Sequence, residues 1–216
     1  MTCSLPRAFS IALLCLGLLL AVACAKPSQP PLPVGNLKLG LAGFTQPKMP
    51  SDMLAGWQVE DTPTVEAVDL DELDGILSSV LTKESRHSFL GRESADRCRR
   101  VVHAESGSPR AALRTWSAVG RCMGVDLLVV PQIMEYRKRD GGPIGVVSPA
   151  RVVSDIFIVD VRNETLISRS RFDETQSSLT GNLLDTDKFL KRGAHWITAA
   201  ELAREGMEKA VKELGL

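Results

Sequence analysis

The sequence predicts an α/β fold in which a mixed, largely antiparallel sheet contains a three-strand meander and carries helices packed on its faces. A continuous apolar run at Leu127–Val130 is typical of a strand that is buried on both sides. Two further strand-like stretches follow it closely, and turn residues separate them. Segments with apolar residues three and four positions apart stand before and after these strands, which predicts helices that cover the sheet.

The N-terminal part of the predicted domain passes from strand to helix. Leu37–Phe44 is expected to be the first strand, with Gly40 and Gly43 marking close packing or a bulge. Thr45–Val65 contains three prolines and little periodicity, so we expect it to be irregular. Asp69–Thr82 is predicted to be an amphipathic helix. Its apolar stripe consists of Leu70, Leu73, Ile76, Leu77, Val80 and Leu81.

The next segments lead into the strongest predicted strand. Ala95–His103 fits a helix and a strand equally well. Ser108 followed by Pro109 predicts the start of a helix, since serine caps helix N-termini and proline is favoured at the first helical position. We expect this helix to stop at Gly124, immediately before the strand Val125–Tyr136.

The C-terminal part is predicted to complete the meander and to end in a helix. Arg137–Pro143 is expected to be the turn of a hairpin, with Asp140–Gly141 as its signal. The last helix should begin at Thr198, where Glu201 completes a capping box. Between the hairpin turn and the last helix we expect four elements in chain order. These are a strand at Val152–Val161, a turn at Asn163–Glu164, a strand at Thr165–Phe172 and a short helix at Asp185–Lys191.

The first 23 residues are predicted to be a signal peptide. Arg7 supplies a positive charge, and Phe9–Ala23 is apolar over a length that suits a signal-peptide core and is short for a membrane span. The run ends in Leu20-Ala21-Val22-Ala23-Cys24, which resembles the lipobox that is cut before a lipidated cysteine. We therefore expect acyl chains on Cys24. The alternative is an ordinary signal peptide cleaved after Ala23.

Residues 24–36 are predicted to form a lipidated, proline-rich tether, and residues 37–216 a single domain. Prolines keep such a tether extended, with a reach of about 35 Å. Ala25 follows Cys24 where aspartate would retain a lipoprotein in the inner membrane of enterobacteria. The resemblance to enterobacterial lipoprotein sorting therefore implies that the mature protein is anchored at the periplasmic face of the outer membrane. The expected partners are the membrane and an envelope protein, and a homo-oligomer is left open.

Cys98 and Cys122 are the cysteines that remain besides the predicted signal peptide and Cys24. An even pair in an oxidising compartment predicts a disulfide, and two buried free thiols are the alternative. The 26 basic and 26 acidic residues balance, which argues against nucleic-acid binding. No cofactor or metal is expected, because Leu73 stands at the fifth position of the calcium-like segment Asp69–Gly75 and the cysteines lack zinc spacing.

Three segments carry a resemblance to known envelope proteins: Leu37–Phe44, Gly124–Val130 with its Gly-x-Asp step into a buried strand, and Ser154–Val161. Their pattern resembles the compact domain of lipoproteins related to the curli secretion lipoprotein. Similar domains occur in the lipoprotein activators of penicillin-binding proteins and at the N-terminus of the Tol-Pal periplasmic protein. Arg171–Gln176 and Phe189–Gly193 are also similar to segments of lipoproteins from sulfate- and metal-reducing bacteria.

Two places in the sequence are candidate contacts for a protein partner. The basic cluster Arg137, Lys138 and Arg139 stands at the predicted hairpin, where phosphate groups of lipid are a second conceivable ligand. Trp196 stands next to basic residues before the last helix. The alternative readings are a solvated turn that protects strand edges and an indole that covers the core.

The sequence contains no nucleophile elbow, no metalloprotease helix and no phosphate-binding loop, so we expect a non-enzymatic interaction or assembly module. One alternative is a subunit of an oligomeric secretion or transport-associated assembly. Another is a hydrolase of envelope polymers that uses surface carboxylates, although structural ion pairs are the expected role of these groups. The carboxylates concerned are Asp155, Asp160, Asp173 and Glu174.

Overall fold

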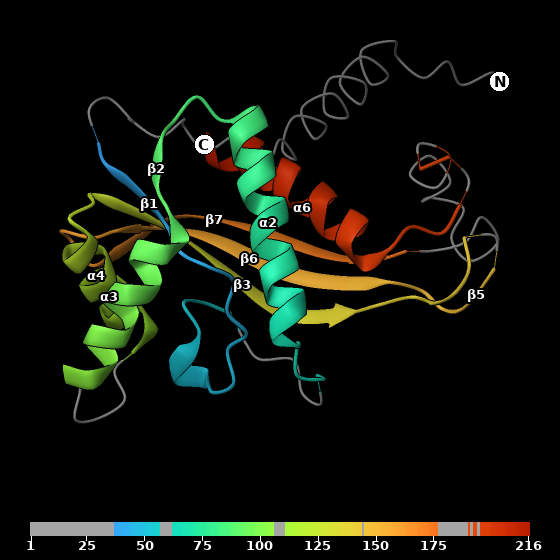
Figure 1. Ribbon diagram of the computed structural model, residues 1–216, viewed down its shortest axis with the longest axis horizontal. Helices are drawn as coiled ribbons and strands as arrows, with labels where there is room; N and C mark the ends of the chain where they lie inside the picture. Colours follow the sequence, from blue (N-terminus) through green and yellow to red (C-terminus); the bar gives the residue numbers. More distant parts are fainter. Residues whose placement is uncertain are drawn as a thin grey trace, which may run out of the picture. The chain divides into compact units, whose positions relative to one another are not determined.

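The computed structural model describes residues 37–56, 62–105, 111–143, 145–176, 190, 192–193 and 195–216. Within this part, a five-stranded sheet has the strand order β2-β1-β3-β6-β7, and β4 and β5 form a separate two-stranded sheet (Figure 1). The predicted α/β fold is confirmed. The predicted signal peptide, Cys24 and the tether lie outside the described residues.

The main sheet combines parallel and antiparallel pairs. β1 (Leu39–Leu41) pairs in parallel with β2 (Phe89–Leu90) and with β3 (Leu127–Arg137). β3, β6 (Arg151–Asp160) and β7 (Thr165–Thr175) run antiparallel to their neighbours. The three-strand meander expected from the sequence is therefore present.

Helices cover both faces of this sheet. α2 (Ala67–Glu84) and α6 (Ala199–Leu214) pack on one face, and α3 (Arg92–Glu105) and α4 (Ala112–Met123) pack on the other. The helix predicted over 69–82 is confirmed as α2, and the ambiguous segment at 95–103 lies within α3.

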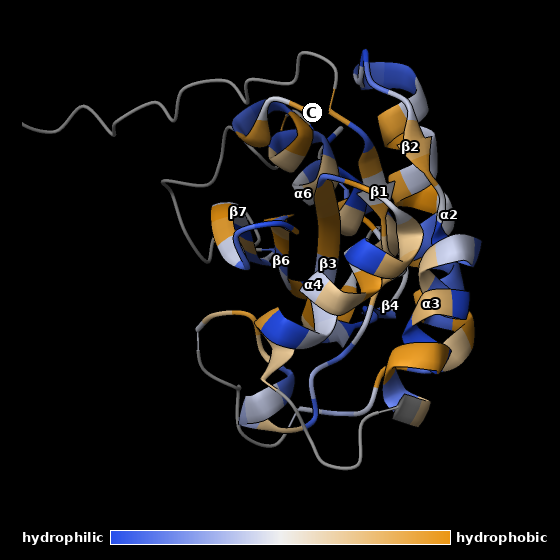
Figure 2. Cartoon of the chain, turned by 90° about the vertical axis from the view of Figure 1, so that its left-hand side faces the viewer, coloured by the Kyte–Doolittle hydropathy of each residue, from blue (hydrophilic) through white to orange (hydrophobic). Residues whose placement is uncertain are grey.

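The apolar run of β3 explains why helices are needed on both faces. Residues 127–134 are all buried, and Figure 2 shows β3 in the hydrophobic colour at the centre of the sheet. Successive strand residues point to opposite faces. Leu127 and Val129 accordingly belong to the core under α2 and α6, whereas Leu128 and Val130 belong to the core under α3 and α4.

Local sequence signals define the ends of two helices as predicted. At the start of α6 the Glu201 N–H donates to Thr198 Oγ1 at 3.1 Å, and the Thr198 N–H donates to the Glu201 carboxylate at 2.7 Å. The bond from the Thr198 N–H is the main cause of the lowered pKa of Glu201. α4 ends at Gly124, whose φ of 70° is the left-handed conformation that glycine adopts readily.

One predicted helix start differs from the structure. α4 begins at Ala112, and Ala111 precedes it without a side-chain cap, so the start expected at Ser108 is wrong for this helix. Ala112 is buried in the core beneath α4, and this packing outweighs the local capping signal. Ser108 and Pro109 lie outside the described residues, as does most of the short helix predicted over 185–191.

The connection between β3 and β6 is longer than the predicted hairpin turn. Asp140–Gly141 is itself a strand, β4, which pairs with β5 (Val146–Ser148). The Gly142 N–H donates to the Gly145 carbonyl at 2.9 Å and closes this small hairpin. The prediction placed the turn directly between the two long strands, whereas a short extra hairpin lies there. An Asp-Gly pair indicates a local bend but does not show which strands the bend joins.

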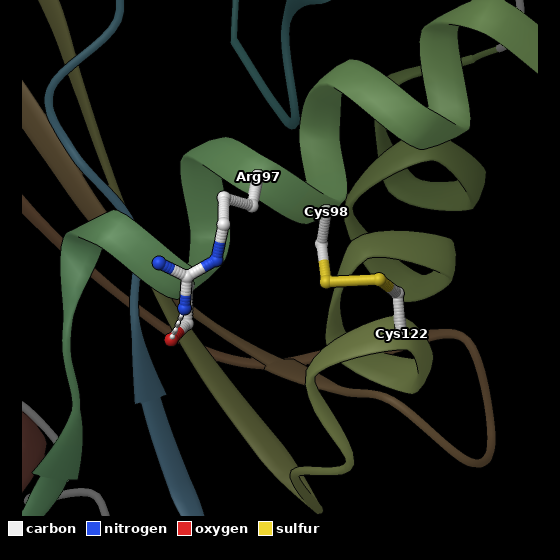
Figure 3. The surroundings of a disulfide bond; sticks show 4 residues. Arg97, Cys98 and Cys122 are labelled. Atoms are coloured by element: carbon white, nitrogen blue, oxygen red, sulfur yellow. Dashed lines mark hydrogen bonds between the residues drawn. A yellow bond between two sulfur atoms is a disulfide. The ribbon is translucent and has the colours of Figure 1, made fainter.

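A disulfide joins the two helices on one face of the sheet, as predicted. Cys98 of α3 and Cys122 of α4 are bonded, with their Cα atoms 5.7 Å apart (Figure 3). Arg97 extends away from the bond and donates to Ser94 Oγ at 3.0 Å. Closing a loop of this length contributes about 3 kcal/mol on the chain-entropy account.

Gly206 of α6 allows a close approach to β7. A Cβ atom at Gly206 would lie 2.6 Å from Cγ of Phe172, so we expect Gly206→Ala to lower the free energy of unfolding by about 1–3 kcal/mol in denaturant titrations. Gly75→Ala in α2 is the matched control, because open space surrounds that position. It should be neutral or stabilising by up to about 1 kcal/mol. Equal effects of the two variants would contradict the close packing.

Candidate functional site

The structure brings the two predicted contact regions together. Arg139 Nη1 donates to the carbonyl of Trp196, and the Trp196 N–H donates to the carbonyl of Pro143 at 2.9 Å. The basic segment and the tryptophan, 57 positions apart, therefore lie on one surface. Val147 on β5 of the same hairpin is 86% exposed. We call Arg137, Arg139, Val147 and Trp196 the hairpin patch.

A buried amide fixes the position of Trp196. Gln176, which is only 1% exposed, donates through Nε2 to the His195 carbonyl at 2.9 Å and accepts from the Ile197 N–H at 2.8 Å. Its backbone N–H donates to Ala150 at 3.2 Å. Gln176 thus ties the chain on both sides of the half-buried Trp196 to the end of the sheet. Trp196 is neither fully exposed nor fully buried, so its position is intermediate between the exposed partner contact and the core-covering indole that the sequence left open.

The three basic residues of the predicted cluster have different roles. Lys138 Nζ lies 2.6 Å from the carboxylate of Asp69 at the start of α2, and this bond raises the pKa of Lys138. Arg139 holds the Trp196 carbonyl, whereas Arg137 is exposed. The cluster is therefore partly structural: Lys138 and Arg139 bind other parts of the chain, and Arg137 and Lys138 are exposed. Asp69 belongs to the calcium-like segment, which is helical as expected.

The carboxylates considered for hydrolysis are held in ion pairs. Asp155 is 0% exposed and accepts from Arg169 at 2.8 and 3.0 Å and from Arg171 at 3.1 Å. Asp173 lies 3.2 Å from Arg151 and 3.5 Å from Arg171, so the pairs form one network across β6 and β7. The ion pair expected between Asp173 and Arg171 is therefore present.

The other two carboxylates lie apart from this network. Asp160 accepts from the N–H of Asn163 at 2.9 Å and from its side chain at 2.8 Å, and the backbone bond is the main cause of its lowered pKa. Glu174 lies 3.8 Å from Arg192. Asp160 and Glu174 thus each contact a different partner.

A pocket of about 530 Å³ lies between α2 and the start of α3. Its lining combines apolar residues with charged or polar ones. The apolar lining residues are Leu41, Ala42 and Leu77, and the others are Asp71, Asp74, Gly75, Ser78, Gly91, Arg92, Glu93 and Ser94. Pockets of this size that combine an apolar surface with convergent polar groups are typical ligand sites.

Asp74 is the central polar group of this pocket. Its Oδ1 accepts from the Phe44 N–H at 2.6 Å, and its Oδ2 accepts from Arg92 Nη1 at 2.7 Å. Arg92 Nη2 also donates to Asp71 at 2.7 Å. Burial raises the pKa of Asp74 to about 6, although the Phe44 N–H and the Arg92 guanidinium act in the opposite direction.

Sequence reasoning missed this pocket. It explained the acidic run at the start of α2 by the positive end of the helix, and it gave Arg92 no role. The available signal was a carboxylate at Asp74, one helical turn after Asp71. The contact with Arg92, 18 positions later, depends on how α3 packs and could not be read from spacing.

The described part of the chain offers no arrangement of three or more histidine, cysteine, aspartate or glutamate residues that could hold a metal ion. Among the same residues, no helix has the length and apolar character needed to cross a membrane.

The sequence matches no family model and no curated protein. Among solved structures, the PelC dodecamer from Paraburkholderia phytofirmans is 13% identical, with a TM-score of 0.48, covering 87% of this chain and 94% of that one. The LpoB C-terminal domain from Salmonella enterica is 8% identical, with a TM-score of 0.40, covering 74% and 93%. Lipoprotein GNA1162 from Neisseria meningitidis is 14% identical, with a TM-score of 0.37, covering 73% and 99%. At these TM-scores, the function has to be argued from the residues of this chain.

The raised pKa of Asp74 predicts a pH-dependent stability. Its folded-state pKa of about 6 lies above its ordinary value of 3.8, so the folded protein binds the proton more tightly than the unfolded chain. The stabilisation that results is complete below pH 4 and is lost as the pH rises to about 6. Relative to Asp74→Asn, the wild-type protein should lose stability across this window and show a constant difference above pH 7. Denaturant titrations at several pH values measure this, and a flat difference would contradict it.

Proposed function

We propose that this chain is a lipid-anchored, non-enzymatic envelope protein that acts as an interaction or assembly module at the periplasmic face of the outer membrane. The use of its cysteines carries the proposal. Cys24 follows a lipobox, and Cys98 and Cys122 are paired in a disulfide. Disulfides form and persist in oxidising compartments such as the periplasm. Each cysteine outside the predicted signal peptide thus has a role that fits an exported lipoprotein.

The ion pairs of the sheet support a non-enzymatic role. A general acid or base must reach its substrate, whereas Asp155 is fully buried and bound by two arginines. Asp173 pairs with Arg151 of the neighbouring strand β6 and with Arg171 of its own strand β7. These groups stabilise the packing of β6 against β7.

The hairpin patch is the surface we assign to a protein partner. Leu39 of β1 is paired with Leu127 at the beginning of β3, so residue 37 and the tether before it enter at that end of the sheet. The patch follows the other end of β3, which at 11 residues is about 36 Å long. A tether that leads away from Leu37 would present the patch on the side away from the lipid. Protein interfaces are enriched in tryptophan and arginine, which here are the half-buried Trp196 and the exposed Arg137. They also bury exposed apolar side chains such as that of Val147.

The lipid anchor is tested by Cys24→Ala. We expect this variant to lose incorporation of labelled palmitate and to leave the membrane fraction, because no other residue of the lipobox can form the thioether. Ser28→Ala in the predicted tether is the control and should be labelled like the wild type. Ala25→Asp should keep the label and move the protein to the inner membrane in an enterobacterial host. Palmitate in the Cys24→Ala variant would contradict the proposed anchor.

The hairpin patch is tested by photo-crosslinking in intact envelopes. A crosslinking amino acid at Val147 should give a defined product with an envelope protein, and Arg137→Glu should reduce its yield several-fold. The control position is Arg162, which is exposed in the β6–β7 turn at the opposite end of the sheet. The same product from both positions, or a yield that Arg137→Glu does not change, would show that the patch is not the contact.

A further inference from the structure

We propose that the pocket between α2 and α3 binds an alkyl-ammonium or guanidinium group carried on an apolar stem. Such a group is supplied either by a lysine or arginine side chain of a partner protein or by a free polyamine. The proposal deepens the interaction role argued above by naming what a second surface recognises. It does not depend on the lipid anchor, so each can fail separately.

The shape of the pocket suits a stem that is apolar along its length. Leu41, Ala42 and Leu77 contribute apolar lining, and the methylene stem of a long basic side chain packs readily on apolar groups. Gly75 and Gly91 stand on the lining with open space where a side chain would begin. A guest can therefore approach the backbone of α2 and the start of α3.

The charges of the pocket favour a cation. Three carboxylates line it, those of Asp71, Asp74 and Glu93, against the single guanidinium of Arg92. Glu93 is exposed and has no ion-pair partner in the described part of the chain. Only one oxygen of Asp71 accepts from Arg92, and its side chain is 65% exposed. A carboxylate offers about four acceptor positions on its two oxygens, so Glu93 and Asp71 keep capacity for an incoming donor.

Carboxylates that line the pocket already accept from a guanidinium of the chain itself. Asp71 and Asp74 each accept from the Arg92 guanidinium at 2.7 Å, and Asp96 lies 3.5 Å from its Nε. These distances show that the wall is spaced to receive planar N–H donors. A second cation beside Arg92 would be placed between Asp71 and Glu93, with its stem over Leu77.

Asp74 makes the binding depend on pH. The groups that face it are Arg92 and Asp96 from α3, Asp71 from α2, and the Phe44 N–H after β1. Protonation of Asp74 removes one negative charge from the wall and leaves the Arg92 cation less neutralised. A guest cation is then repelled more strongly, so affinity should fall as the pH drops below about 6.

The test uses the full chain in a nonionic detergent, with Nα-acetyl-lysine amide and spermidine as probes and NMR of the methyl groups as readout. Both probes should shift the methyl signals of Leu41 and Leu77 in a saturable way. Nα,Nε-diacetyl-lysine amide, which has the same stem without the charge, is the matched neutral probe. A lysine-containing peptide that binds more tightly than spermidine assigns the site to a partner side chain, and the reverse order assigns it to a free polyamine.

Variants separate this pocket from general charge effects. Glu93→Gln and Asp71→Asn should each weaken binding about fivefold. Asp140→Asn removes an exposed carboxylate from the distant β4 strand and should have no effect. Gly75→Leu fills the pocket from a helical position and should abolish binding while the fold is kept. Equal binding of Nα,Nε-diacetyl-lysine amide, equal effects of Asp140→Asn and Glu93→Gln, or no saturable shift with either cation would overturn the proposal.

Discussion

Burial of β3 on both faces is the constraint on which the rest of the structure depends. The eight residues 127–134 are withdrawn from water, and their alternate side chains enter two separate cores. One sheet face therefore needs α2 and α6, and the other needs α3 and α4, because an uncovered apolar face would cost about 25 cal/mol for each Å² left in water. The pocket follows from this arrangement. It lies where α2, which serves one core, and α3, which serves the other, meet beyond the end of β1.

Two buried glutamine side chains attach irregular segments to the sheet. Gln132 accepts from the Leu54 N–H at 3.2 Å and donates to the Asp52 carbonyl at 2.8 Å, which holds the loop after β1 against the edge of the core. Gln176 holds the chain before α6 in the same manner. A buried amide without partners would be costly, so each is a specific anchor and not a gap in the packing. The hairpin patch owes its geometry to Gln176, since Trp196 lies between its two bonds.

Much of the fold could be predicted because its signals are local. The apolar run of β3, the three-and-four spacing of Leu73, Leu77 and Val80, and the capping box at Thr198 each act within one element. The disulfide could be predicted from the compartment and the count of cysteines. The start of α4 and the course of the β4–β5 hairpin could not, because tertiary packing decides them. The Asp74–Arg92 contact and the meeting of Arg139 with Trp196 join residues 18 and 57 positions apart. Periodicity within one element cannot predict contacts between residues so far apart in the sequence.

The position of β1 determines how the domain responds to tension. A pull on the segment before Leu37 enters a strand that lies inside the sheet, between β2 and β3. Backbone hydrogen bonds join this segment to residues 126–133 over its whole length. At one end the Lys38 carbonyl accepts from the N–H groups of Asp126 and Leu127, and at the other the Thr45 carbonyl accepts from the Ile133 N–H at 2.9 Å. A force along the strand axis loads these bonds in shear, all at the same time, instead of opening them one after another. A load applied at residue 37 would therefore be shared among the bonds of an internal strand.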